Sequence, residues 1–126
     1  MTSHATGQLG ENIAASYLEK AGYIILERNY RFERNEIDLI CFDPASSFYS
    51  DGEIVFVEVK ARHGHTFGSP AEAVTPEKQK RIARVAEVFL FERQLVGSPA
   101  RFDVIAINLA SHSPAIEHIK NAFIAP

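Results

Sequence analysis

The sequence contains very little cysteine, and this excludes the class of small proteins held together by disulfides. Among 126 residues there is one cysteine, Cys41, so an internal disulfide is excluded, which fits a reducing cytoplasm. No apolar run approaches the length of a membrane span. The first residues, Met1 to Thr6, also lack the basic stretch and apolar core of a secretory signal. We therefore expect a cytoplasmic protein with no membrane contact.

Repeats, low-complexity tracts and linkers are absent as well, and the composition of 46% hydrophobic and 23% charged residues is that of one globular domain, residues 1–126. The net charge of −3 lacks the basic excess typical of nucleic-acid binding, but charge distribution matters more than the sum. For Arg81 and Arg84 taken alone, a solvated helix face is an equally good interpretation. The basic residues gather in two segments, around Arg28, Arg31 and Arg34 and around Lys60, Arg62, Lys78, Lys80, Arg81 and Arg84.

Periodicity and turn residues predict an α/β fold with the order helix, three strands, helix, strand, and a possible extra edge strand. The linker from Asp43 to Gly52 suits an antiparallel hairpin. The later strand–helix–strand unit favours parallel pairing. The expected elements are a helix over 7–21 capped by Gly22, strands over 23–32, 35–42 and 53–60, a helix opening at Thr75–Pro76 and finishing near 95–99, a strand over 101–109 and an edge strand over 115–120.

Two charges stand near the end of the third predicted strand. Strand alternation places Glu58 and Lys60 on the face of Ile54 and Phe56. Burial of such charges is costly unless they are paired, hydrogen-bonded or bound to an ion. The end of this strand is therefore a candidate site.

The preceding strand supplies a second carboxylate. Alternation assigns Glu36, Asp38 and Ile40 to one face and Ile37, Leu39 and Cys41 to the other. Antiparallel pairing then brings Asp38 toward Glu58 and Lys60.

This convergence predicts a hard divalent cation, Mg²⁺ or Mn²⁺, held by Asp38, Glu58 and the carbonyl of Val59. Metal-assisted phosphodiester hydrolysis suits such a group: the cation polarises the phosphate and lowers the pKa of a water. Lys60 would orient or deprotonate that water or neutralise developing charge. We expect the nucleic acid to be gripped by Arg28, Arg31, Arg34, Arg62, Lys78, Gln79 and Arg81.

Three further residues have two interpretations each. Glu11 shares the apolar face of the first helix, where it is either a charge favoured by the helix dipole or a metal-site or supporting residue. His63 and His65 could bind a metal, but no cysteine or further histidine stands at the spacing of zinc sites, so an exposed loop is the preferred interpretation.

Several short motifs carry a family resemblance. They are Gly10-Glu11, Arg28-Asn29-Tyr30, Glu36-Ile37-Asp38-Leu39-Ile40, Phe56-Val57-Glu58-Val59-Lys60 and Arg101-Phe102-Asp103-Val104. Over nearly the whole chain these resemble the YraN-type bacterial proteins, which are similar to archaeal Holliday-junction resolvases within the PD-(D/E)xK nuclease superfamily.

The resemblance implies a restriction-endonuclease-like core with a mixed four- to five-stranded sheet, and an Mg²⁺-dependent endonuclease acting on branched or structured DNA, with a homodimer allowed. It places Glu11, Asp38, Glu58 and Lys60 at active-site positions, and Lys78-Gln79 at a neighbouring helix motif. The chain departs from the family in Asn35, where glycine is usual, and in its long loop from Asp43 to Gly52.

Two other functions are weighed against the endonuclease. One is a nucleic-acid-binding module on a nuclease fold with weak or no catalysis. The other is an interaction protein in which Glu58 and Lys60 form a buried pair. Retention of Asp38 favours the nuclease, because binding alone does not need it.

Overall fold

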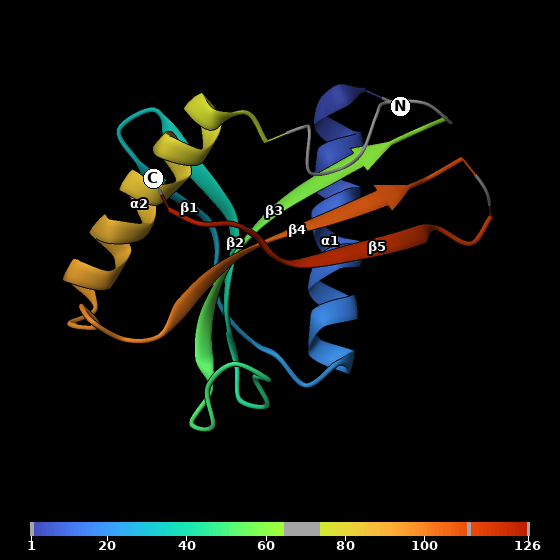
Figure 1. Ribbon diagram of the computed structural model, residues 1–126. Helices are drawn as coiled ribbons and strands as arrows, with labels where there is room; N and C mark the ends of the chain where they lie inside the picture. The colour runs from blue at the N-terminus through green and yellow to red at the C-terminus, as the bar shows by residue number, and fades with distance from the viewer. Residues whose placement is uncertain (1, 65–73, 111, 126) are drawn as a thin grey trace.

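The computed structural model describes residues 2–64, 74–110 and 112–125, which form one mixed sheet with two helices (Figure 1). The predicted order of elements and the fifth, edge strand are confirmed. The bounds are α1 Ser3–Lys20, β1 Ile24–Phe32, β2 Asn35–Asp43, β3 Glu53–Arg62, α2 Pro76–Glu92, β4 Ala100–Asn108 and β5 Ala115–Phe123. Within the described ranges no helix is long and apolar enough to cross a membrane.

The helix ends follow from capping. α1 begins four residues before the predicted Gly7, because the Thr2 hydroxyl accepts a hydrogen bond from the Ala5 N–H at 3.1 Å. Gly22, at φ +96°, ends it as predicted.

α2 starts at Pro76 after the Thr75 cap, as predicted, but ends earlier than expected, at Glu92. Gln94 adopts a left-handed conformation with φ 58°, and the Leu95 N–H bonds back to the Leu90 carbonyl at 2.7 Å, which closes the helix.

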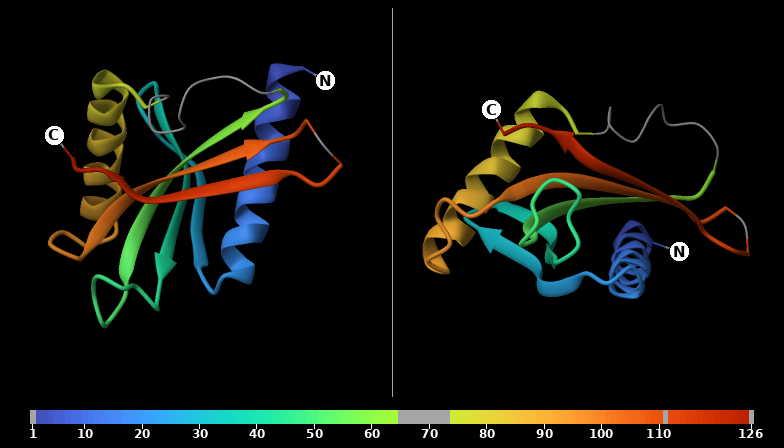
Figure 2. Two further views of the ribbon diagram at one scale, coloured as in Figure 1. Left: turned by 45° about the vertical axis from the view of Figure 1, so that its right-hand side comes forward. Right: turned by 60° about the horizontal axis from the view of Figure 1, so that its bottom comes forward.

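The strands lie in the order β1-β2-β3-β4-β5, with only the β3–β4 pair parallel. Both predicted pairings, the β2–β3 hairpin and the parallel crossover, are confirmed. The β2–β3 ladder stops at Leu39 opposite Val57, although β1 stays paired with β2 and β4 with β3 well beyond that point. The sheet therefore forks, and in Figures 1 and 2 the β1–β2 hairpin runs toward α2 while the end of β3 runs toward α1.

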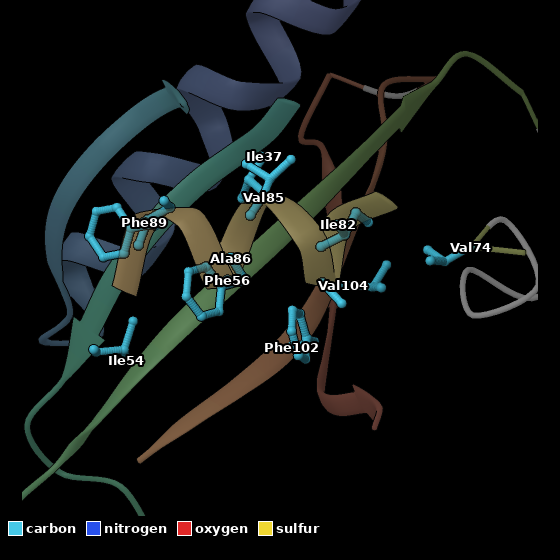
Figure 3. Packing of buried hydrophobic residues seen from close by; sticks show 12 residues of the cluster. Ile37, Ile54, Phe56, Val74, Ile82, Val85, Ala86, Phe89, Phe102 and Val104 are labelled. Atoms are coloured by element: carbon cyan, nitrogen blue, oxygen red, sulfur yellow. The ribbon is translucent and has the colours of Figure 1, made fainter. Parts of the chain in front are cut away.

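Each face of the sheet has its own apolar cluster. On one face α2 contributes Val85 and Phe89, which pack on Phe56 and Phe102 (Figure 3). On the other face α1 contributes Ala14, Ala15 and Leu18, which pack with β-strand residues including Leu39, Val55, Val57 and Ile105. Two layers of helix thus fix the sheet from both sides, and the fork lies between them.

One predicted alternation is wrong. Ile37 lies in the α2 cluster with Ile40, whereas Leu39 and Cys41 lie in the α1 cluster, so Ile37 and Leu39 do not share a face. The change of face occurs beside Asn29 of β1, which adopts a left-handed conformation with φ 52°.

The same change of face separates Glu36 from Ile40. Glu36 lines a polar pocket with α1 residues, while Ile40 packs under α2. At the hairpin turn, Glu33 (φ 57°) rather than Asn35 takes the left-handed conformation, because Asn35 is already paired with Phe32 in the ladder.

Candidate functional site

Beyond Val57, main-chain groups of β3 no longer pair with β2 in the ladder. The side chain of Asp38 bonds one of these groups instead. The Val59 N–H donates to Asp38 Oδ2 at 2.8 Å. Because the N–H and C=O of one strand residue point to the same side, the Val59 carbonyl faces the same gap. Asp38 is therefore fixed at the point where the two branches of the sheet part.

Glu58 lies on the face of Ile54 and Phe56, as the alternation predicted, and this face is the one that α2 covers. Its side chain is only 7% exposed, and its Oε2 forms an ion pair with the Lys78 ammonium from the first turn of α2. The Thr75 hydroxyl caps that turn and accepts the Lys78 N–H at 3.3 Å. The buried pair expected between Glu58 and Lys60 in the interaction-protein interpretation is thus made with Lys78 instead.

Lys60 lies half-buried in the same group. Its ammonium is within hydrogen-bonding range of Lys78, and burial together with this neighbouring cation lowers the pKa of Lys60. For Lys78, burial alone would lower the pKa, but the hydrogen bonds with Glu58 and Lys60 and the Glu58 charge raise it. Two ammonium groups and two carboxyl groups therefore meet at one point.

The two carboxyl groups repel each other when both are ionised. Burial raises the pKa of Asp38 to about 9, helped by a hydrogen bond with Glu58 and by the Glu58 charge, and opposed by the Val59 N–H. The raised pKa favours a protonated Asp38 at neutral pH when no ion is bound, at a place where a cation could replace the proton.

The donor set fits a hard divalent ion. Asp38, Glu58 and the Val59 carbonyl offer oxygen only, and Mg²⁺ is usually held by one or two carboxylates completed with water. Among the described residues no group of three or more His, Cys, Asp or Glu side chains could hold a metal. Any ion here would therefore depend on the two carboxylates and the main chain.

Glu11 lies on the α1 side of this pair and is bonded to the neighbouring strand β1. It accepts a hydrogen bond from Asn29 Nδ2 at 2.8 Å, and Asn29 stands opposite Asp38 in the β1–β2 register. Its charge also raises the pKa of Asp38, by less than burial and Glu58 do. Glu11 remains a predicted site residue, in a supporting place on the α1 side.

Asn29 belongs to the family motif Arg28-Asn29-Tyr30, but the sequence analysis assigned it no role of its own. An asparagine inside a β-branched and aromatic strand pattern is the signal that could have found it, because asparagine tolerates the left-handed conformation.

The predicted nucleic-acid contacts are spread over both branches. Arg28 donates to Asn12 Oδ1 at 2.6 Å and Arg31 pairs with Glu36 at 3.1 Å, both on the α1 side. The others are Arg34, exposed in the hairpin turn; Arg62, at the end of β3; Gln79, which donates to the Val74 carbonyl; and Arg81, exposed on α2 beside Glu77. Of these seven, Lys78 pairs directly with the predicted catalytic residue Glu58.

The histidine pair is only partly described. His63 Nε2 lies 3.4 Å from the Thr6 hydroxyl, while His65 lies outside the described residues.

A second buried charged cluster lies at the other end of β3, and the sequence analysis missed it as a unit. Arg101, 3% exposed, donates to Asp43 (3.1 Å), Glu53 (2.7 Å), Asp103 (2.9 Å) and the Tyr23 hydroxyl (2.8 Å). The sequence signal that could have indicated this cluster is the presence of charged residues at the ends of three apolar strands. Since every partner is paired and buried, this cluster is structural.

Comparison with known proteins identifies relatives across almost the full chain. The profile of the uncharacterised protein family UPF0102 matches residues 10–107. Among the relatives, each named only as a UPF0102 protein, one from Syntrophus aciditrophicus is 48% identical over 118 residues, which is 94% of this chain and 87% of the relative. One from Chlorobium chlorochromatii is 49% identical over 124 residues, with 93% and 89% covered. One from Clostridium botulinum is 42% identical over 120 residues, with 93% and 92% covered.

Proposed function

The chain belongs to the UPF0102 family of uncharacterised proteins, to which YraN-type proteins correspond, and from its site we propose that it is a divalent-metal-dependent endonuclease. The proposed substrate is branched or structured DNA. The two branches of the forked sheet both carry basic residues, so they could contact two arms of such a substrate. Membership of the PD-(D/E)xK nucleases is part of this proposal.

One observation carries it. Asp38, Glu58, Lys60 and Lys78 converge from two strands and a helix at the point where the β2–β3 ladder ends. Unlike the fully buried Arg101 cluster, this group reaches solvent, because the Lys78 side chain is 36% exposed while Glu58 is 7% exposed, so a cation and a polyanion can approach it. A site that binds a polyanion and a cation uses all four.

The roles of the side chains follow from their positions. Asp38 and Glu58 would hold the ion together with the Val59 carbonyl, and the Val59 N–H keeps the Asp38 carboxylate aimed at the gap. When bound, a divalent cation supplies a Lewis acid that polarises a phosphoryl oxygen. Lys60, whose pKa is lowered by burial and by the neighbouring Lys78, would orient or deprotonate a water nucleophile, or donate hydrogen bonds to a phosphate oxygen.

A cleavage assay tests the proposal. Labelled four-way junctions, flaps, duplexes and single strands are incubated with the protein and Mg²⁺ or Mn²⁺, and then with EDTA. We expect EDTA-sensitive cleavage of at least one structured substrate. Absence of cleavage from every substrate with either ion would contradict the proposal.

A second function, nucleic-acid binding with weak or no catalysis, is favoured by one specific observation. The Lys78 ammonium already pairs with Glu58, so the site is satisfied without an ion. Gel shifts at low salt with the same DNA panel separate the two functions, because a binding module would shift DNA without cleaving it. If no DNA is shifted, this second function is excluded.

A further inference from the structure

Lys78 occupies an unusual place for a surface-helix lysine. Its side chain reaches from the first turn of α2 to the buried carboxylate of Glu58, and it remains 36% exposed while Glu58 is 7% exposed. The Thr75 cap fixes its main chain, so only the flexible side chain can move. The ammonium group therefore bridges the buried carboxylate and the solvent side of the gap.

This contact has a direct consequence for cations. Glu58 is one of the two side-chain oxygen donors that a divalent ion would use, and Lys78 neutralises it first. An incoming ion competes with the ammonium for Glu58, and an ammonium displaced from Glu58 remains beside Lys60 while the ion occupies the carboxylates. Two adjacent ammonium groups repel each other, so the displaced state favours a polyanion close by.

We propose that Lys78 is a built-in counter-ion of Glu58 that opposes divalent-cation binding in the DNA-free protein and transfers to a backbone phosphate when DNA and the cation bind together. This inference rests on the proposed function and deepens it. Lys78 is a positioning residue in this scheme: it exchanges one charge-assisted hydrogen bond, to a carboxylate, for another, to a phosphate oxygen. Cation and DNA binding then become mutually favourable, and the coupling is the same measured from either side.

The test measures Mn²⁺ affinity directly, without reference to turnover. Isothermal titration with Mn²⁺ alone, at mildly alkaline pH and low salt, is compared for the wild type, Lys78→Met, Lys78→Arg and Lys80→Met. Lys80 lies exposed on the same helix, so Lys80→Met removes one positive charge without touching Glu58. Circular dichroism and thermal unfolding verify that each variant is folded.

We expect Lys78→Met to bind Mn²⁺ about tenfold more tightly than the wild type, a change equivalent to about 1.4 kcal/mol. Lys78→Arg and Lys80→Met should stay within about twofold of the wild type, since one keeps the ion pair and the other never formed it. Equal affinity of the wild type and Lys78→Met overturns the inference but leaves the proposed function intact. Failure of every variant to bind Mn²⁺ overturns both.

A second titration adds a four-way DNA junction at saturating concentration. The junction should tighten Mn²⁺ binding to the wild type and have a clearly smaller effect in Lys78→Met. An equal tightening in both proteins would show that another group couples the two ligands, which overturns the inference.

Discussion

Asp38 Oδ2 lies 2.8 Å from the main-chain nitrogen of Val59, so a side chain of β2 completes the hydrogen bonding of β3 where the ladder between the strands has ended. The contact joins the two branches of the fork at their base. It also orients a carboxylate toward Glu58, which a free side chain at the end of a strand would not achieve.

The first prediction concerns the cation. Asp38→Ala and Glu58→Ala should each weaken Mn²⁺ binding by about tenfold or more, because even residues that only support metal ligands act on this scale. Titration calorimetry measures the change. Asp51→Ala, an exposed carboxylate in the β2–β3 loop, is the matched control and should bind as the wild type does. Unchanged binding by both site variants would refute the assignment of the metal site.

The second prediction separates chemistry from binding. Lys60→Ala should reduce cleavage by about 100-fold or more, the range of general acid–base contributions, while DNA affinity stays nearly constant. Single-turnover cleavage and gel shifts on the same junction give the two quantities. Equal cleavage by the variant and the wild type would point to a contaminating nuclease.

The third prediction tests the packing of α1 on β3. Gly10 is buried, and a Cβ built there meets the Ala61 side chain and lies 3.7 Å from Val59 Cγ1. Gly10→Ala should lower the free energy of unfolding by about 1–3 kcal/mol through overpacking. Gly7→Ala, on the same helix with nothing within 4 Å of its Cβ, should raise it by about 0.5–1 kcal/mol. Urea denaturation compares them, and stabilisation by both substitutions would contradict the close approach.

The fourth prediction concerns acid stability. Burial alone would raise the pKa of Asp103, but hydrogen bonds from His118, Arg101 and the Asn121 N–H outweigh it and lower the pKa. A carboxyl whose folded pKa is lowered stabilises the protein above its unfolded pKa of about 3.9, and this contribution is lost as pH falls toward the folded value.

Asp103→Asn should therefore destabilise the protein at neutral pH and flatten the decline of its stability below about pH 4. Urea midpoints measured at stepped pH give both quantities. Asp51→Asn, an exposed carboxylate, should leave the curve parallel to that of the wild type. A curve for Asp103→Asn that is also parallel would show that Asp103 does not contribute to the acid limb.

Much of the fold was predictable from local patterns. The Thr75–Pro76 start of α2, the cap at Gly22 and the alternation that places Glu58 on the face of Phe56 are each specified within a few residues. The convergence of Asp38 and Glu58 needed one further step, the antiparallel hairpin, which the turn residues near Gly52 indicate.

The remainder depends on contacts distant in sequence. Ile37 and Leu39 pack in different clusters, at a place where the neighbouring strand carries Asn29 in a left-handed conformation, and a period-two pattern within β2 does not contain this information. The pairing of Glu58 with Lys78, rather than with Lys60, depends on how α2 returns across the sheet. Arg101 bonds Tyr23, which precedes β1, and residues of β2, β3 and β4. These partners lie too far apart in the sequence for a local pattern to group them.

Because the β2–β3 ladder ends early, the length of the β1–β2 hairpin can change without changing the charged group at its base. The β1–β2 hairpin extends beyond the last β2–β3 pair and turns through Glu33 and Arg34, where Glu33 pairs with Arg84 of α2 at 3.4 Å. Residues inserted in that turn would lengthen one arm and leave the charged group at its base unaltered. Under the proposed nuclease function, the length of this turn would set how thick a substrate can reach the charged group, independently of the residues that form that group.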